Sequence, residues 1–160
     1  MWIEEGVTPD FIVVDGSEGG TGAAPIDFED HMGMPLTHGL MLMHNALVGT
    51  GLRDQIKIGA SGKVAGGSDI VMRMIQGADY TNSARAMMMA TGCIQAQACH
   101  TNECPVGVAT QDPVLRKRFK GLPEHVVNYF FFVAEDVRRI MAEMGFTKIE
   151  ELVGRSDLLD

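Results

Sequence analysis

Three strand-like segments, each followed by a glycine-containing loop and a helical pattern, constrain the fold of this chain most strongly. Phe11-Ile12-Val13-Val14 is a continuous apolar run rich in residues that favour strands, a pattern typical of a parallel strand buried on both faces. Further strands are predicted at residues 55–60 and 79–83. Helices between consecutive strands act as crossover connections, and such connections make a parallel sheet.

The helical patterns between these strands have recognisable ends. Residues 36–48 are mostly apolar and predict one helix. Ser68 is the expected N-cap of the next helix, and Gly77 is expected to end it. A short helix at residues 84–90 follows the last predicted strand and leads into a segment that contains the cysteines.

A long amphipathic helix is predicted from Pro123 to Gly145. Its expected apolar face consists of residues at helical spacing, namely Val126, Phe130, Val133, Val137, Ile140, Met141 and Met144. Thr147 and Glu150, three positions apart, predict a capping box at the start of a final short helix.

The loops after parallel strands form the functional face of barrels and open sheets. The first such loop runs from Asp15 to Pro25 and is rich in glycine, so a ring or a carboxylate could sit against its backbone. Asp15, Glu18 and Thr21 are its candidates for action on a polar substrate. The alternative is a flexible surface loop.

Three further segments, at residues 59–63, 77–79 and 82–85, are each interpreted as a strand end that runs into a helix start. Backbone N–H groups at helix N-termini bind phosphate, and barrels often hold a phosphate between the loops after their last two strands. Gly62-Lys63 is not part of a Walker motif, because Val64 stands where Ser or Thr is needed. Ordinary turns between strands and helices are the alternative interpretation.

The three cysteines of the chain form the pattern Cys93-x5-Cys99-x4-Cys104, followed directly by Pro105. An odd number of cysteines in one short window argues against a disulfide framework. Their offsets point to different faces of a regular helix, so the segment is expected to be a loop wrapped around something. Thiolates suit soft metal sites. Three interpretations stay open: an iron–sulfur cluster, most simply with three irons; a zinc site that adds His100; or three buried free thiols.

An excess of acidic residues limits the partners of the chain. There are 13 Lys and Arg against 21 Asp and Glu, a net charge of -8, and such a chain repels the phosphate backbone of nucleic acids. No apolar run approaches the roughly 18 residues of a membrane span. The first residues lack the basic head and the apolar stretch of a signal peptide. We therefore expect a cytoplasmic location, with neither nucleic acid nor a membrane as a partner.

Taken together, these segments resemble the synthase domain of the FMN-binding glutamate synthases. The matching stretches are residues 14–25, 60–63, 77–79, 92–113 and 123–128. The most specific stretch is 92–113, because it contains all three cysteines and the phrase that follows them. The resemblance implies an α/β fold: the carboxy-terminal portion, about three βα units, of an FMN-binding (β/α)8 TIM barrel, followed by a helical carboxy-terminal extension.

The resemblance also implies cofactors and site residues. A 3Fe–4S cluster would lie beside the flavin, with Cys93, Cys99 and Cys104 as its ligands. Two loops would hold the FMN phosphate, and their residues are Ser61, Gly62, Lys63, Asn82, Ser83, Ala84 and Arg85. Electrons from a donor such as ferredoxin or a flavoprotein subunit would pass through the cluster to FMN. Reduced FMN would convert 2-iminoglutarate, formed from 2-oxoglutarate and ammonia or glutamine-derived ammonia, to glutamate.

The length of 160 residues departs from the family, because a (β/α)8 barrel needs about 200 residues or more. We expect an incomplete catalytic domain, inactive alone, whose missing half is lost by truncation or supplied by another chain. Residues 1–92 would be the last barrel units, 93–113 the cluster loop and 114–160 the helical extension. The alternatives are a non-catalytic cluster- or partner-binding domain that completes a split barrel, and an FMN barrel oxidoreductase with another substrate.

Overall fold

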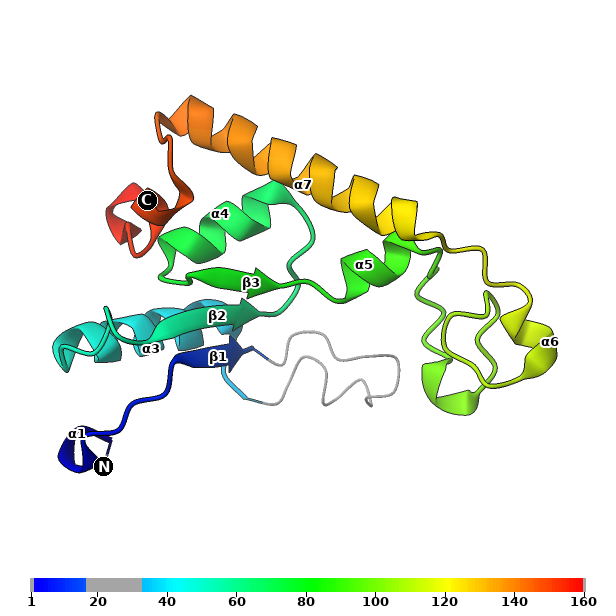
Figure 1. The fold of residues 1–160 in the computed structure, drawn as a ribbon, viewed down its shortest axis with the longest axis horizontal. Helices are drawn as coiled ribbons and strands as arrows, with labels where there is room; N and C mark the ends of the chain where they lie inside the picture. The colour runs from blue at the N-terminus through cyan, green and yellow to red at the C-terminus, as the bar shows by residue number, and fades with distance from the viewer. Residues whose placement is uncertain (1, 17–32, 160) are drawn as a thin grey trace.

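The computed structural model describes residues 2–16 and 33–159 of the chain, and Figure 1 shows their arrangement. The three strands lie side by side, and one long helix runs from the carboxy-terminal segment to a separate lobe of loops. The elements in chain order are α1 (Trp2–Glu5), β1 (Phe11–Asp15), α3 (Leu36–Gly49), β2 (Lys57–Ser61), α4 (Gly67–Ile75), β3 (Tyr80–Asn82), α5 (Arg85–Ala90), η1 (Cys99–Thr101), α6 (Pro113–Arg116), α7 (Pro123–Met144), η2 (Ile149–Leu152) and η3 (Ser156–Leu158).

The sheet is parallel with strand order β1-β2-β3, as the alternation of strands and helices predicts. The register places Asp15, Ser61 and Asn82, the last residues of the three strands, in one row. Strand β2 starts at Lys57, later than expected, because the N–H groups of residues 55 and 56 donate to the carbonyl of Leu52 in a turn.

One face of the sheet carries the core, and the other is open. On the open face, formed by Phe11, Val13, Lys57 and Tyr80, Phe11 is 59% exposed and Val13 is 41% exposed. The prediction that the first strand is buried on both faces is therefore wrong for the described residues, because no described element covers this face. The buried core residues on the other side are Leu36, Leu40, Leu47, Ile56, Ile58, Ala60, Val71, Met74, Ile75, Ala78, Val137, Met141 and Leu152.

An aromatic side chain crosses the open face. The ring of Tyr80 lies over Gly59, where a Cβ atom would be 2.5 Å from the Cζ atom of Tyr80. The same ring meets the ring of Phe11 edge to face, with the centroids 6.4 Å apart. Tyr80 thus spans β2 and links all three strands on this face.

Helix α4 begins at Gly67 and not after an N-cap at Ser68, so that prediction is wrong. The carboxylate of Asp69 accepts the N–H groups of residues 65 and 66, each at 3.0 Å. The carboxylate of Asp136, which belongs to α7, accepts the N–H of Gly67 at 2.9 Å. Two carboxylates therefore cap this helix, and one of them comes from a distant part of the chain.

Helix α7 has the predicted ends, with Gly145 at a φ of +81° after its last turn. Its apolar face is only partly as predicted, because Val137 and Met141 are buried whereas Phe130 and Met144 are exposed. The carboxy-terminal half of α7 packs on α4, and its amino-terminal half extends past α5 toward the lobe of loops (Figure 1). Neither α7 nor any other helix of the described residues is long and apolar enough to cross a membrane.

The capping box near the carboxy terminus uses Glu151 and not the predicted Glu150. The carboxylate of Glu151 accepts the N–H groups of Thr147 and Lys148 at 3.4 and 3.3 Å. The box is shifted by one residue because the N-cap of η2 is Lys148, so that Glu151 occupies the third helical position.

Candidate functional site

A row of polar side chains marks the carboxyl ends of the three strands. Asp15, Ser61 and Asn82 are neighbours in the strand register, and the Ser61 hydroxyl donates to the Asp15 carboxylate at 3.0 Å. These residues alternate along the strands with more buried ones, so their side chains belong to the open face. Glu18 and Thr21, the other two substrate candidates, lie outside the described residues.

The loop after β2 is held by two hydroxyl groups. Ser83 Oγ donates to the carbonyl of Val64 at 2.8 Å, and the Tyr129 hydroxyl donates to the carbonyl of Ala65 at 2.8 Å. The two hydroxyl oxygens are 3.1 Å apart. The two loops predicted to bind phosphate are thus linked to each other and to α7.

The same loop turns sharply at its start. Gly62 has a φ of +148° and Lys63 a φ of +48°. A side chain at position 62 would strain the backbone, and its Cβ would lie 3.2 Å from the Leu36 side chain. Glycine at this position is therefore required by the turn itself, whatever the loop binds.

The helices that follow β2 and β3 differ at their N-termini. The N–H groups of residues 65–67, where the chain enters α4, are taken by the carboxylates of Asp69 and Asp136. The hydrogen bond from Arg139, and then that from the N–H of Gly67, lower the pKa of Asp136, so this carboxylate is charged at neutral pH. An anionic ligand is disfavoured beside it. Helix α5 follows Ala84, and no side chain caps its N-terminus. The candidate phosphate site is therefore limited to the loop after β2 and the segment after β3.

Residues 77–79 lie at the amino-terminal ends of the strands, so their interpretation as a strand end that runs into a helix is wrong. They connect the end of α4 to the start of β3. The Arg53 guanidinium donates to the Asp79 carboxylate at 2.8 Å and to the Gly77 carbonyl at 3.0 Å. It also donates to Nδ1 of His44 at 3.0 Å. Burial, and then the charge of Arg53, lower the pKa of His44, so the imidazole accepts this bond in its neutral form.

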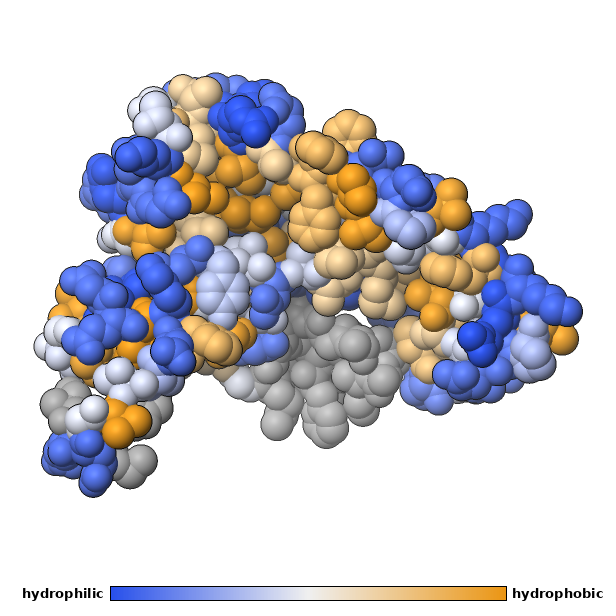
Figure 2. Space-filling model, in the orientation of Figure 1, coloured by the Kyte–Doolittle hydropathy of each residue, from blue (hydrophilic) through white to orange (hydrophobic). Residues whose placement is uncertain are grey.

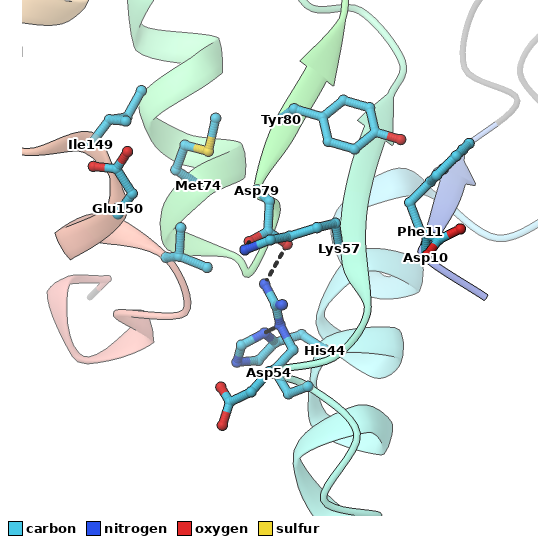
Figure 3. A pocket seen from close by; sticks show the side chains of 12 residues that line it. Asp10, Phe11, His44, Asp54, Lys57, Met74, Asp79, Tyr80, Ile149 and Glu150 are labelled. Carbon is cyan, nitrogen blue, oxygen red and sulfur yellow. Dashed lines mark hydrogen bonds and ion pairs between the residues drawn. The ribbon is translucent and has the colours of Figure 1, made fainter. Parts of the chain in front are cut away.

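A cavity of about 1000 Å3 opens beside this ion pair (Figure 3). Its walls include Phe11, Lys57 and Tyr80 from the open face, together with His44 and Ile149. The cavity lies at the amino-terminal ends of the strands, and that end of a parallel barrel serves stability and not chemistry. We therefore place the candidate functional site at the carboxyl ends of the three strands.

The cysteine lobe, residues 93–113, is a loop with short helical turns, as predicted, on the side toward which the strands point (Figure 1). Cys93 and Cys99 are half-buried, Cys104 is buried, and all three thiols are free. Within residues 2–16 and 33–159, no group of three or more His, Cys, Asp and Glu side chains is arranged to hold a metal ion. The structure thus forms the predicted loop without bringing the three sulfurs together as one set of ligands.

The backbone of the cysteine lobe is strained. Gln95, Gln97 and Asn102 have φ values of 55°, 54° and 65°. A left-handed glutamine costs about 1–2 kcal/mol, whereas asparagine adopts this conformation more readily. The side-chain oxygen of Asn102 accepts the N–H of Gln111 at 2.6 Å and so joins the middle of the lobe to its carboxy-terminal part. The lobe is held in a conformation that its residues do not favour on their own.

Backbone N–H groups surround the sulfur of Cys104. Hydrogen bonds from the N–H of Ala109, and to a smaller extent from those of residues 106–108, lower the pKa of this thiol although burial opposes them. The N–H of Gln95 approaches the sulfur of Cys93 at 3.4 Å. Hydrogen bonds of this kind stabilise the thiolate, which is the form that binds soft metals. The donor chemistry of the lobe therefore fits iron–sulfur ligation.

Three residues that hold the loops at the two ends of the strands do not stand out in the sequence. Tyr129 and Asp136 of α7 hold the loop after β2, and Arg53 holds the opposite edge. Tyr129 and Asp136 are seven positions apart and so lie on one face of the helix. Polar residues on an otherwise apolar face are the signal that could identify this pair, whereas a single arginine in a loop gives no such signal.

Comparisons with known proteins show what the chain is similar to. A profile of the conserved region in glutamate synthase matches residues 3–147. The NADPH glutamate synthase large chain of Bacillus subtilis (strain 168) is 46% identical over 152 residues, which are 95% of this chain and 10% of that protein. The ferredoxin-dependent glutamate synthase of Antithamnion sp. is 46% identical over 149 residues, 93% of this chain and 10% of that protein. The chain thus spans about a tenth of the length of these relatives.

Among solved structures, flavocytochrome b2 shares the fold. A variant with sulfite bound aligns with 99% of this chain and 31% of that chain, at a TM-score of 0.61 and 19% identity. A variant with pyruvate bound aligns at a TM-score of 0.57 and 17% identity, over 96% of this chain and 30% of that chain. This likeness confirms the predicted fold class, about three βα units of a (β/α)8 barrel followed by a helical extension.

Proposed function

Because this chain belongs to the glutamate synthase family, we propose that it forms the flavin- and cluster-binding part of a glutamate synthase-type oxidoreductase. The observation that carries the proposal is the position of the cysteine lobe. It lies on the side to which the carboxyl ends of the strands point, where parallel barrels carry their chemistry (Figure 1). A flavin at the carboxyl ends of the strands and a cluster in the cysteine lobe would be neighbours, as electron transfer between them requires.

The FMN phosphate would sit between the loop after β2 and the segment after β3. Two observations support this position: Ser83 ties the segment after β3 to the Val64 carbonyl of the loop after β2, and carboxylates occupy the competing N-terminus of α4. Lys63 and Arg85 would add positive charge to the site. The full set of proposed phosphate residues is Ser61, Gly62, Lys63, Asn82, Ser83, Ala84 and Arg85.

Cys93, Cys99 and Cys104 would hold a 3Fe–4S cluster. The N–H groups around the Cys104 sulfur support this assignment. The strained backbone supports it as well, because the free energy of ligation would offset the cost of the left-handed residues. Zinc held with the help of His100 is the competing assignment, although adjacent residues such as Cys99 and His100 rarely bind one ion together.

The proposed reaction is the reduction of 2-iminoglutarate, formed from 2-oxoglutarate and ammonia or glutamine-derived ammonia, to glutamate. When bound, FMN would supply a hydride and the cluster would supply single electrons. Asp15, held by the Ser61 hydroxyl at the edge of the open face, would orient the nitrogen of the substrate by its charge. Among the relatives are a ferredoxin-dependent and an NADPH enzyme, so ferredoxin and a flavoprotein subunit are the proposed electron donors.

The open face requires a further partner. Three parallel strands cannot close a barrel, so the remaining strands would have to come from the same polypeptide or from another chain. The open face also favours a second candidate function, a non-catalytic cluster-binding domain that completes a split barrel. Both candidates need the same cover over Phe11 and Val13, and they differ in whether flavin binds.

Anaerobic purification of the complete polypeptide, followed by flavin, iron and sulfide analysis, tests the proposal. We expect one FMN per chain, iron and sulfide in the ratio of a 3Fe–4S cluster, and glutamate formation from 2-oxoglutarate with a reduced donor. Iron without flavin would favour the non-catalytic domain. Zinc in place of iron would contradict the cluster assignment.

A further inference from the structure

Tyr129 belongs to α7 but contacts the loops at the carboxyl ends of β2 and β3. Its hydroxyl and that of Ser83 make three close oxygen contacts: 2.8 Å to the Val64 carbonyl, 2.8 Å to the Ala65 carbonyl and 3.1 Å between themselves. Two hydroxyl groups carry only two hydrogens, so only two of these contacts are hydrogen bonds at one time. With both hydrogens on the carbonyls, two successive peptide groups of the loop are fixed together.

Helix α7 makes a second polar contact with the same stretch. Asp136 accepts the N–H of Gly67 at 2.9 Å. Tyr129 and Asp136 are two helical turns apart and share one face of α7. Both contacts fall within residues 64–67, so α7 supports the part of the loop that directly follows the proposed phosphate-binding residues.

We infer that Tyr129 is a positioning residue for the phosphate group of FMN. The inference rests on the proposed function, because it assumes that the phosphate lies between the loop after β2 and the segment after β3. Tyr129 holds the Ala65 carbonyl while Ser83 holds the neighbouring Val64 carbonyl, so Tyr129 fixes the loop after β2 in the position in which Ser83 of the other segment bonds to it. It acts through them and not by contact with the flavin.

The test compares FMN with riboflavin, which lacks the phosphate, in binding titrations of the complete apoprotein. Tyr129→Phe keeps the ring and removes the hydroxyl. We expect FMN affinity to fall roughly five- to tenfold, as for the loss of one hydrogen bond, and riboflavin affinity to stay unchanged. Tyr80→Phe is the matched control, because the only other tyrosine packs over Gly59 away from these loops, and it should leave both affinities unchanged.

The outcomes separate the inference from the proposed function. An unchanged preference for FMN over riboflavin in Tyr129→Phe would overturn the inference while FMN binding by the wild type upheld the proposed function. Equal losses for both flavins would also overturn it, because they indicate a general structural role. A wild type that binds no FMN would overturn both.

A measurement on the wild type covers the case in which the variant does not fold. Hydrogen exchange should slow in residues 64–67 and 125–133 together when FMN binds. Riboflavin should leave the exchange rates of residues 125–133 as they are in the flavin-free protein. Equal protection of this helix segment by the two flavins would contradict the inference.

Discussion

The open face of the sheet predicts that this chain associates with itself when it is expressed alone. Phe11 is 59% exposed, and since a phenylalanine side chain offers about 200 Å2, about 120 Å2 of it faces solvent. At about 25 cal/mol per Å2, covering that area contributes about 3 kcal/mol. Val13, 41% exposed, adds about 1 kcal/mol. Two copies that cover this face on each other would gain about 8 kcal/mol, from which the loss of rotational and translational freedom subtracts.

Sedimentation equilibrium on paired variants measures this contribution. The double variant Phe11→Thr with Val13→Thr removes apolar area and keeps residues that favour strands. We expect the wild type to form dimers or larger species at concentrations of about 1–100 µM, and the double variant to associate at least about tenfold more weakly. Phe131→Ala is the control, because Phe131 is 72% exposed on α7, outside the sheet, and its removal should leave association unchanged.

Two results would refute the reasoning. A compact wild-type monomer with a cooperative thermal transition would mean that the sheet is stable in water without a cover. Loss of association in Phe131→Ala, with no change in the strand variant, would move the contact surface to α7. In either case the open face would not be the surface that drives association of the isolated chain. The isolated chain is also expected to form no glutamate.

Three further changes, made in the complete polypeptide, have defined outcomes. Cys99→Ser should remove the visible iron absorption, and an unchanged iron content would contradict the cluster. Arg53→Met should lower the free energy of unfolding in urea by about 3 kcal/mol, because the buried Asp79 keeps only the exposed Lys57 as a charged partner. Arg155→Met breaks an exposed pair and should lower the free energy of unfolding far less, so equal losses would contradict this reasoning. Because the pKa of His44 is lowered in the folded state, the free energy of unfolding should be full above about pH 6.5 and decline below it, where only the unfolded state takes up the proton. His44→Asn should reduce this dependence of the free energy of unfolding on pH.

Local patterns were sufficient to predict most of the helices and strands. The apolar run at residues 11–14 identifies β1, and Pro123 and Gly145 identify both ends of α7. In each case the deciding interaction lies within a few residues: strand preference, the fixed φ of proline or the left-handed turn of glycine. The cysteine spacing predicted a loop for a similar reason, since its offsets do not fit one face of a helix.

The errors come from contacts between residues that are far apart in the chain. Ser68 has the chemistry of an N-cap, but the N–H of Gly67 is held by Asp136, which is 69 positions away. Phe130 has the spacing of an apolar helix face, but α4 lies against the other half of α7 and leaves this ring exposed. The role of Tyr129 at the loops was invisible for the same reason, because no local pattern shows which residues of a helix will face a loop.

Because the Tyr80 ring lies over Gly59, the side chains at positions 59 and 80 share one limited space between neighbouring strands. A methyl group at position 59 would lie 2.5 Å from the ring, so a larger residue there demands a smaller one at position 80. Related sequences should therefore vary at these two sites in concert, with a large ring opposite glycine or the reverse. A mutational route that changes position 59 first would pass through a destabilised intermediate, whereas shrinking position 80 first leaves only a cavity to refill. The order of the two changes is thus constrained by packing alone.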